Sequence, residues 1–202
     1  MKKEYSETEI KIKTAAKSLF LKKGYSATTT REIAKESDIN LALLNYYFTS
    51  KWKLFEIIMF ETLYDFLSKM VEVYNDEKTS LEEKIKLTCE KYIDMTIAEP
   101  LLPTFVLNEL KNNPTSFLKM PSTKMIMKSK LVVQYQEGVK KGIYTKLEPI
   151  HFVTNIMSLI VFPFMCSPIL KKMEKLNTKE FNTLMLERKK SIPKWIIKMI
   201  KK

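Results

Sequence analysis

The stretch ATTTREIAKESDINLALLNYYFTSKWKL, residues 27–54, decides the fold of this chain. Thr28, Thr29 and Thr30 are good N-caps, which predicts a short helix that starts at one of them and turns Ile33 and Ala34 inward. The polar residues 37–40 supply turn and capping chemistry before a second helix over residues 41–47. A third helix starts at Lys51. Two short helices joined by a tight turn are the pattern of a helix-turn-helix, whose second helix enters the major groove of DNA.

The second helix carries the candidates for reading DNA. Leu41, Ala42, Asn45 and Tyr46 lie around its start and exposed side, where base edges are met. An asparagine amide can bridge two atoms of an adenine, although contact with a phosphate is an equal alternative for Asn45. Residues at helix starts and on the rim position the protein against phosphates. The complete predicted set is Thr30, Arg31, Asn40, Leu41, Ala42, Asn45, Tyr46, Tyr47 and Lys51.

These residues resemble the TetR family of bacterial transcriptional regulators over residues 10–58. The resemblance rests on several spaced elements: Gly24-Tyr25, Thr29-Thr30-Arg31-Glu32-Ile33-Ala34, Ile39-Asn40, Leu44, Phe48, Ser50-Lys51 and Leu54. In this family a tyrosine usually follows the leucine of the second helix, whereas this chain has Asn45 at that position. The resemblance implies a ligand pocket in the C-terminal domain and a two-fold dimer through the last two helices.

The whole chain is predicted to be all-α. Among its 202 residues are only three glycines, and long stretches have apolar residues at helical spacing, whereas runs typical of strands are absent from the sequence. The spacing predicts about nine helices, including one near residues 122–141 and a last helix that Pro193 kinks. A capping box at Ser80 and Glu83 predicts the start of another helix.

We expect two domains, a three-helix DNA-binding domain over residues 1–50 and a larger helical domain over residues 51–202 for ligand binding and dimerisation. The first is too small for a robust core, so the helix that begins at Lys51 should continue into the second domain. A ligand that shifts the far end of this helix would then tilt the DNA reader.

The net charge of +12 is unevenly distributed. Residues 1–52 carry +4, residues 53–118 carry −5, and residues 119–202 carry +13. Almost all of the basic residues are lysine, and a solvated lysine surface is the usual explanation for such a bias. An anionic ligand or an auxiliary contact with DNA is the alternative for the C-terminal part.

Residues 152–170 form a run of 19 residues without a charge, which reaches the length of a membrane span. Polar residues and two prolines within it favour a buried helix at a subunit interface, and we expect no membrane association. In the resembling family this would be the penultimate helix. The predicted dimer residues on it and on the last helix are Phe152, Ile156, Leu159, Ile160, Phe181, Leu184 and Met185.

A ligand pocket would be lined by the methionine- and phenylalanine-rich stripes of the C-terminal helices, with a few embedded polar groups to orient the ligand. The candidates are Phe66, Tyr92, Phe105, Asn108, Glu109, Tyr135 and Asn155. Ordinary core packing is the alternative for each of them. Glu109 favours a cationic ligand, whereas the lysines of the C-terminal part favour an anionic one, so the pattern leaves the charge of the effector open.

Three functional classes compete. The first is a cytoplasmic homodimeric regulator, a repressor that a small and mainly apolar effector releases from a palindromic operator in double-stranded DNA. The second is an architectural or interaction protein that binds DNA without an effector. An enzyme is poorly supported, since the chain has one histidine and no phosphate-binding loop or nucleophile–base pattern. Two distant cysteines predict neither a metal site nor a disulfide, and no cofactor is expected.

Overall fold

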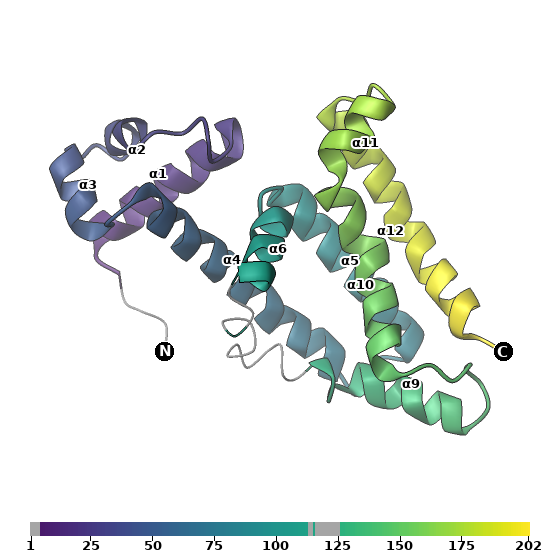
Figure 1. Cartoon of the computed structure of the whole chain (residues 1–202). Helices are drawn as coiled ribbons and strands as arrows, with labels where there is room; N and C mark the ends of the chain where they lie inside the picture. The colour runs from purple at the N-terminus through teal and green to yellow at the C-terminus, as the bar shows by residue number, and fades with distance from the viewer. Residues whose placement is uncertain (1–4, 113–114, 116–125) are drawn as a thin grey trace. The chain divides into compact units, whose positions relative to one another are not determined.

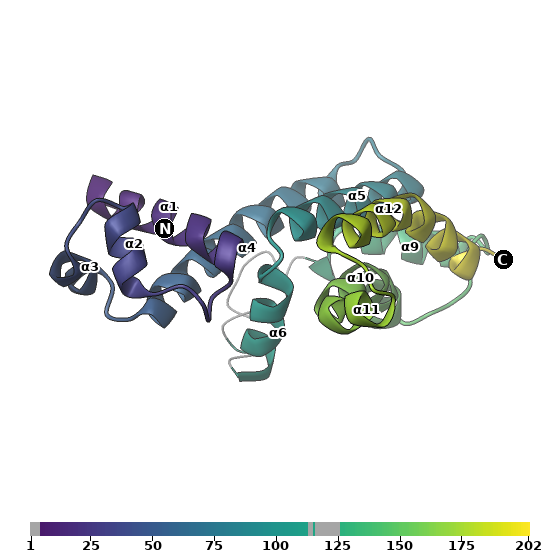
Figure 2. The same cartoon turned by 90° about the horizontal axis from the view of Figure 1, so that it is seen from above.

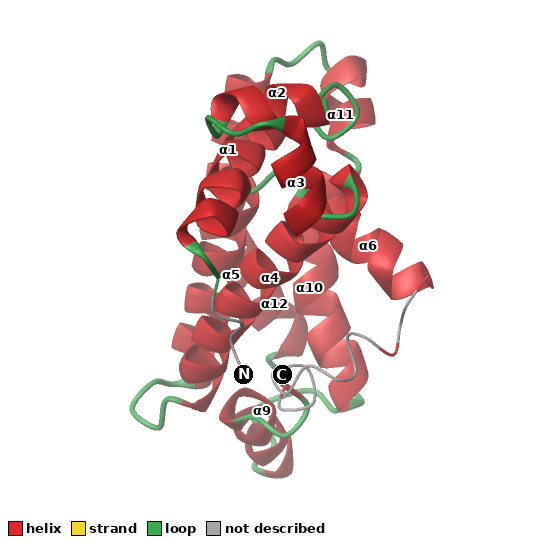
Figure 3. Cartoon of the chain, turned by 90° about the vertical axis from the view of Figure 1, so that its left-hand side faces the viewer, coloured by secondary structure: helices red, strands yellow, loops and turns green. Residues whose placement is uncertain are grey.

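The computed structural model describes residues 5–112, 115 and 126–202, except for the side chain of Glu109. The described residues form helices joined by loops, as Figure 3 shows, and within them the only extended pairing is an isolated antiparallel bridge between Tyr144 and Lys201. The predicted all-α fold is confirmed. The helices are α1 (Glu7–Lys23), α2 (Thr30–Glu36), α3 (Leu41–Tyr47), α4 (Lys51–Asn75), α5 (Leu81–Ala98), α6 (Leu102–Asn112), α9 (Lys130–Lys140), α10 (Pro149–Met165), α11 (Ser167–Met173) and α12 (Thr178–Ile200).

The chain divides between Leu63 and Tyr64 into two compact units. The first half of α4 belongs to the N-terminal unit and its second half to the C-terminal unit, so one continuous helix contributes to both (Figure 1). The sequence places the boundary near residue 50, at the start of α4. The structural division falls later, because Leu54, Phe55 and Ile58 are buried residues of the N-terminal unit.

The N-terminal unit is built on α1, α2, α3 and the first half of α4. A capping box begins α1, in which Ser6 Oγ accepts from Glu9 N at 3.2 Å and Ser6 N donates to Glu9 Oε2 at 2.9 Å. Gly24 ends the helix at φ 80°, a conformation that glycine adopts without strain. The core consists of apolar side chains from all four helices: Ile12, Ala16, Phe20, Ile33, Leu44, Phe48, Leu54, Ile58 and Met59.

The C-terminal unit is organised around α5, which packs against α10 and α12 (Figures 1 and 2). The capping box predicted at its start is confirmed, because Ser80 Oγ accepts from Glu83 N at 3.2 Å and Glu83 Oε2 accepts from Ser80 N at 2.8 Å. Figure 1 shows α5, α10 and α12 running in similar directions, and their contacts place α10 and α12 beside α5. Their inward faces make the core with residues such as Ile85, Cys89, Ile156, Ile160, Ile192 and Ile196.

The uncharged run forms two helices rather than the single one expected. It bends by 63° at Cys166, between α10 and α11. Pro168 lies in the first turn of α11, where its missing N–H is tolerated but where it cannot continue the preceding helix. Because α11 intervenes, α10 is not the penultimate helix. Among the described residues, no single helix has the length and hydropathy of a membrane span, and only this bent pair reaches them jointly.

The helix expected near residues 122–141 corresponds to α9 among the described residues. Residues 122–125 lie outside them, and α9 begins at Lys130 because Ser129 adopts an extended conformation at φ −70° and ψ 159°. Gly142 follows α9 with φ 75°, as expected of a glycine after a helix end. The last helix, α12, runs from Thr178 to Ile200 and includes Pro193.

Candidate nucleic-acid interface

The start of α2 is fixed by a capping box and an ion pair. Thr29 Oγ1 accepts from Glu32 N at 3.2 Å, and Glu32 Oε2 accepts from Thr29 N at 2.9 Å. Lys23, at the end of α1, lies 2.6 Å from Glu32 Oε1. The hydrogen bond from Lys23, followed by those from Thr29, lowers the pKa of Glu32 to about 2. Glu32 is therefore ionised at neutral pH and ties the start of α2 to the end of α1.

The turn between α2 and α3 depends on Asp38. Its φ of 56° is left-handed, a conformation that aspartate tolerates better than most side chains. Ser37 Oγ donates to the Ile33 carbonyl at 2.6 Å, and Ile39 N donates to the Ala34 carbonyl at 3.0 Å. These bonds satisfy the last carbonyls of α2 while the chain reverses, so α3 begins immediately after residue 40.

Helix α3 presents one side to its own core and the other to solvent. Asn40 caps it, because Asn40 Oδ1 accepts from Leu43 N at 2.7 Å. Leu44 is fully buried, whereas Ala42, Asn45 and Tyr46 are exposed, the last with 80% of its surface accessible. Since positions three and four residues apart share a helix face, Ala42, Asn45 and Tyr46 form one exposed surface, which we call the reading face.

The remaining predicted DNA-binding residues lie before and after the reading face in the sequence, within the same unit. Arg31 and Asn40 are exposed, whereas Thr30, Leu41 and Tyr47 are half-buried. The Tyr47 ring meets the Tyr46 ring edge-on, with the ring centroids 5.2 Å apart. This contact supports the more exposed Tyr46 side chain from one side.

Lys51 has a structural role that the sequence did not reveal. Its ammonium donates to the carbonyl of Tyr25 at 2.9 Å and to that of Thr28 at 2.7 Å, and it lies 4.3 Å from the centroid of the Tyr25 ring. The first turn of α4 is thereby attached to the loop between α1 and α2. An ammonium has three N–H donors, so one remains for a DNA phosphate.

An aromatic cluster next to Lys51 was missed in the sequence. Trp52 is 42% exposed, and its ring meets the rings of Tyr25 and Phe55, with centroids 5.6 Å away in each case. The available signal was a tryptophan between Lys51 and Lys53 at a helix start. The cluster places an exposed indole beside basic groups, so Trp52 joins the candidate DNA contacts.

Described residues of the C-terminal unit line a cavity of about 60 Å³. Three hydroxyl-bearing residues and five apolar ones line it: Tyr74, Thr88, Tyr92, Ile126, Leu131, Val153, Ile156 and Met157. Burial raises the pKa of Tyr92 to about 12. This phenol is therefore neutral at physiological pH and can donate a hydrogen bond.

The structure brings together few of the predicted ligand residues. Tyr92 lines the cavity, and Phe66 meets the Tyr92 ring edge-on with centroids 4.5 Å apart. Tyr135 has a different role, because its hydroxyl donates to the Thr145 carbonyl at 2.8 Å and its ring stacks on Phe152 at 4.2 Å.

Among the described side chains, the other predicted ligand residues do not line this cavity. Phe105 is buried, and Asn108 is exposed on α6. Asn155 Nδ2 lies 3.6 Å from Met199 Sδ, between α10 and α12. The side chain of Glu109 lies outside the described residues.

Most predicted dimer residues are buried within their own chain. This set comprises Phe152, Ile156, Ile160, Phe181 and Met185. Leu159 is half-buried and Leu184 is 41% exposed. Helical periodicity identified the apolar positions, but most of them pack inside the protomer and offer little surface to a partner.

Comparisons with known proteins agree on one family. A sequence profile described as "Bacterial regulatory proteins, tetR family" matches residues 12–58. The probable HTH-type transcriptional regulator YttP of Bacillus subtilis is 33% identical over 162 residues, which cover 78% of this chain and 77% of YttP. The HTH-type transcriptional regulator QacR of Staphylococcus aureus is 40% identical over 92 residues, covering 41% of this chain and 46% of QacR.

A solved structure supports the fold along the chain. The crystal structure of a TetR transcription regulator from Haloarcula marismortui matches with a TM-score of 0.67 and 18% sequence identity. The match covers 98% of this chain and 100% of that one.

Lys51→Met tests the structural role of the ammonium, because methionine retains an apolar stem but cannot donate to the Tyr25 and Thr28 carbonyls. We expect the free energy of unfolding to fall by about 1–2 kcal/mol, as two charged hydrogen bonds are lost at a partly exposed site. Urea denaturation of the full chain measures this change, with Lys53→Met as the control. The structural role would be contradicted if Lys51→Met leaves stability unchanged and lowers the salt dependence of DNA binding by about one ion. Lys51 would then contact only a phosphate.

Proposed function

The chain belongs to the TetR family of bacterial transcriptional regulators, and from this membership we propose that it is a cytoplasmic repressor that a small-molecule effector releases from a palindromic operator. The observation that supports the DNA-binding part best is the reading face. It lies on the second helix of a capped helix-turn-helix, which is the element that meets base edges in proteins of this kind. Regulation without an effector is the alternative.

Within this proposal, the reading face contacts bases and its surroundings contact phosphates. Asn45 is exposed and its amide has no partner within the described residues, so it can bridge the N6 and N7 atoms of an adenine. Arg31, Asn40 and Tyr47 would then position α3 against the DNA backbone, as would the remaining donor of Lys51.

Asn45→Ala distinguishes a base contact from a phosphate contact. If Asn45 reads a base, we expect a loss of about 1–3 kcal/mol at one position of each operator half-site and little effect on DNA of unrelated sequence. Binding to a set of single-base operator variants measures this, with Asn112→Ala on α6 as the control. An equal loss on every sequence would assign Asn45 to a phosphate.

We further propose that the exposed apolar residues of α10 and α12 join two protomers. Phe162 is 60% exposed, Trp195 is 47% exposed and Leu184 is 41% exposed. Arg188 connects the two helices, because its Nη2 donates to the Leu159 carbonyl at 2.9 Å. A dimer would bury these side chains and give the two copies of α3 the spacing that a two-fold operator requires.

Phe162→Lys tests this interface without disturbing the core of the protomer, because the Phe162 side chain is mostly exposed. Burying the new charge between subunits is unfavourable, so we expect monomers and weak operator binding. Sedimentation measures the assembly, and Leu110→Lys, another exposed apolar position, is the control. A dimer of normal stability in Phe162→Lys would show that the interface lies elsewhere.

The effector is proposed to enter the unit beside Tyr92. A cavity of about 60 Å³ is far smaller than the 300–1,000 Å³ typical of ligand sites, so an effector must separate the helices around it. These include α4 at Tyr74, and α4 also contributes to the DNA-binding unit. The proposal requires the effector to prefer the DNA-free arrangement, by about 5.5 kcal/mol for a change from 1:99 to 99:1.

A screen of apolar molecules, with release of operator DNA as the readout, tests the effector proposal. The phenol of Tyr92 would orient the ligand, so we expect Tyr92→Phe to weaken a releasing compound by about tenfold while Tyr64→Phe does not. A compound whose affinity and release activity are unchanged in Tyr92→Phe and Glu109→Gln would place the pocket elsewhere. Complete absence of release would favour the regulator without an effector.

A further inference from the structure

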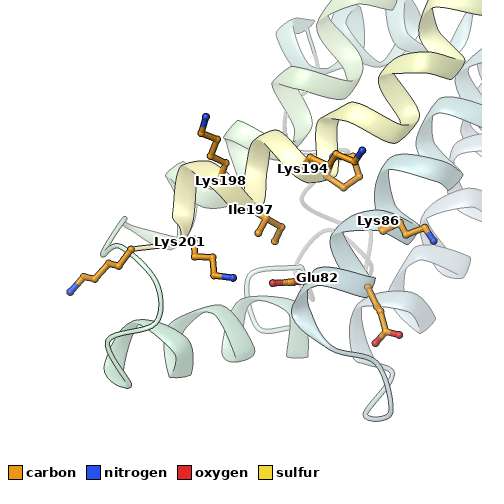
Figure 4. A pocket seen from close by; sticks show the side chains of 9 residues that line it. Glu82, Lys86, Lys194, Ile197, Lys198 and Lys201 are labelled. Carbon is orange, nitrogen blue, oxygen red and sulfur yellow. The ribbon is translucent and has the colours of Figure 1, made fainter.

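A groove on the C-terminal unit runs between the first turns of α5 and the last turns of α12 (Figure 4). Its volume is about 780 Å³, within the range of small-molecule sites. The α5 side contributes Glu82, Glu83 and Lys86, and the α12 side contributes Pro193, Lys194, Ile197, Lys198, Lys201 and Lys202. The core cavity beside Tyr92 shares none of these residues, so the groove is a separate feature.

The α12 side of the groove combines apolar and basic groups on one helical stripe. Lys194, Ile197, Lys198 and Lys201 are separated by three, four and seven positions, which places them on one face of the helix. Ile197 and Pro193 are half-buried, so they supply an apolar floor. The lysines beside them have hydrocarbon stems that can lie along apolar surface while their ammonium groups remain in water.

The basic residues of the groove differ in their partners: Lys86 on α5 lies 4.0 Å from Glu90, whereas the lysines on α12 make no ion pair within the described part of the chain. Lys194, Lys198, Lys201 and Lys202 make no ion pair there, whereas Lys189, earlier on the same helix, lies 2.6 Å from Asp94. Glu83 is committed to the capping box, where its carboxylate accepts from the Ser80 N–H and hydroxyl at 2.8 and 2.9 Å. Glu82 is the other acidic residue that lines the groove, so the five lining lysines still leave a surplus of positive charge next to the apolar floor.

We propose that this groove binds a small amphipathic anion, with a carboxylate, sulfonate or phosphate head on a hydrocarbon body. The head pairs with the ammonium groups of Lys194 and Lys198, and the body covers Pro193 and Ile197. A polyanion such as DNA needs the charge but not the apolar floor, so the combination favours an amphiphile. Its monomeric form is the occupant, because the groove has the volume of a single small molecule.

Titration calorimetry of the full chain with decanoate, below the concentration at which decanoate forms micelles, tests the proposal. We expect saturable binding of one decanoate per chain that weakens as salt is added, since part of the attraction is ionic. Acetate, which has the head without the tail, should not bind at the same concentrations. Decyltrimethylammonium, which has a similar tail and the opposite charge, should bind at least tenfold more weakly.

Two variants locate the site on the protein. Lys194→Gln combined with Lys198→Gln removes two charges from the groove, and we expect about tenfold weaker decanoate binding. Lys172→Gln combined with Lys179→Gln makes the same charge change at exposed positions outside the groove, and it should bind decanoate as the unmodified chain does. Circular dichroism confirms that each variant is folded.

Three results would overturn the proposal. The first is equal decanoate affinity in the two double variants, and the second is equal binding of decyltrimethylammonium and decanoate by the unmodified chain. The third is a failure to bind monomeric decanoate, accompanied by lysine-dependent binding to phosphatidylglycerol vesicles or to double-stranded DNA. That result would assign the surface to a membrane or to nucleic acid instead.

Discussion

The burial of Leu44 and Ile33 in the core of the N-terminal unit is the constraint on which the DNA-binding unit depends. Helices α2 and α3 have seven residues each, and helices this short are unstable in water on their own. They persist because each is capped at its start and places an apolar residue in a shared core. The exposed positions of α3 are therefore fixed by its buried ones, and a reading face exists only while that core is intact.

Two lysines show that positive charge in this protein has a structural use. Lys51 binds the carbonyls of Tyr25 and Thr28 in the loop between α1 and α2. Lys84 is fully buried, and its ammonium binds the Asp76 carbonyl at 2.5 Å and the Thr79 carbonyl at 2.7 Å, in the loop between α4 and α5. Each side chain ties a helix to a loop. Part of the net charge is thus committed to holding loops, so charge alone is a poor guide to where DNA binds.

Local signals in the sequence predicted the DNA-binding motif well. The bounds of α3, the turn before it and the capping box at Ser80 follow from short-range chemistry, in which a side chain satisfies the backbone of its near neighbours. The bend at Cys166 was missed because apolar composition predicts burial but not continuity. Pro168, in the first turn of α11, prevents α10 from continuing as one helix through the uncharged run.

Contacts between distant segments could not be predicted in the same way. The periodicity of α10 marks Phe152, Ile156 and Ile160 as buried, but it does not distinguish the core of one chain from an interface between two. Tyr135 illustrates the same limit for ligand residues. A phenol among apolar residues resembles a pocket group, yet its hydroxyl is satisfied by the backbone of residues 145 and 147. The sequence likewise does not show that Lys194 and Lys198 line a groove, because the other side of the groove belongs to α5, which is distant in sequence.

Site-specific photocrosslinking to DNA tests the central claim, that the exposed face of α3 reads the operator. A photoreactive amino acid at Tyr46, the most exposed residue of that face, is irradiated on a fragment that the protein has selected from genomic DNA. The account predicts cross-links to bases at two positions related by two-fold symmetry, and none from the same group at Lys198. Cross-links from position 198 without any from position 46 would contradict it.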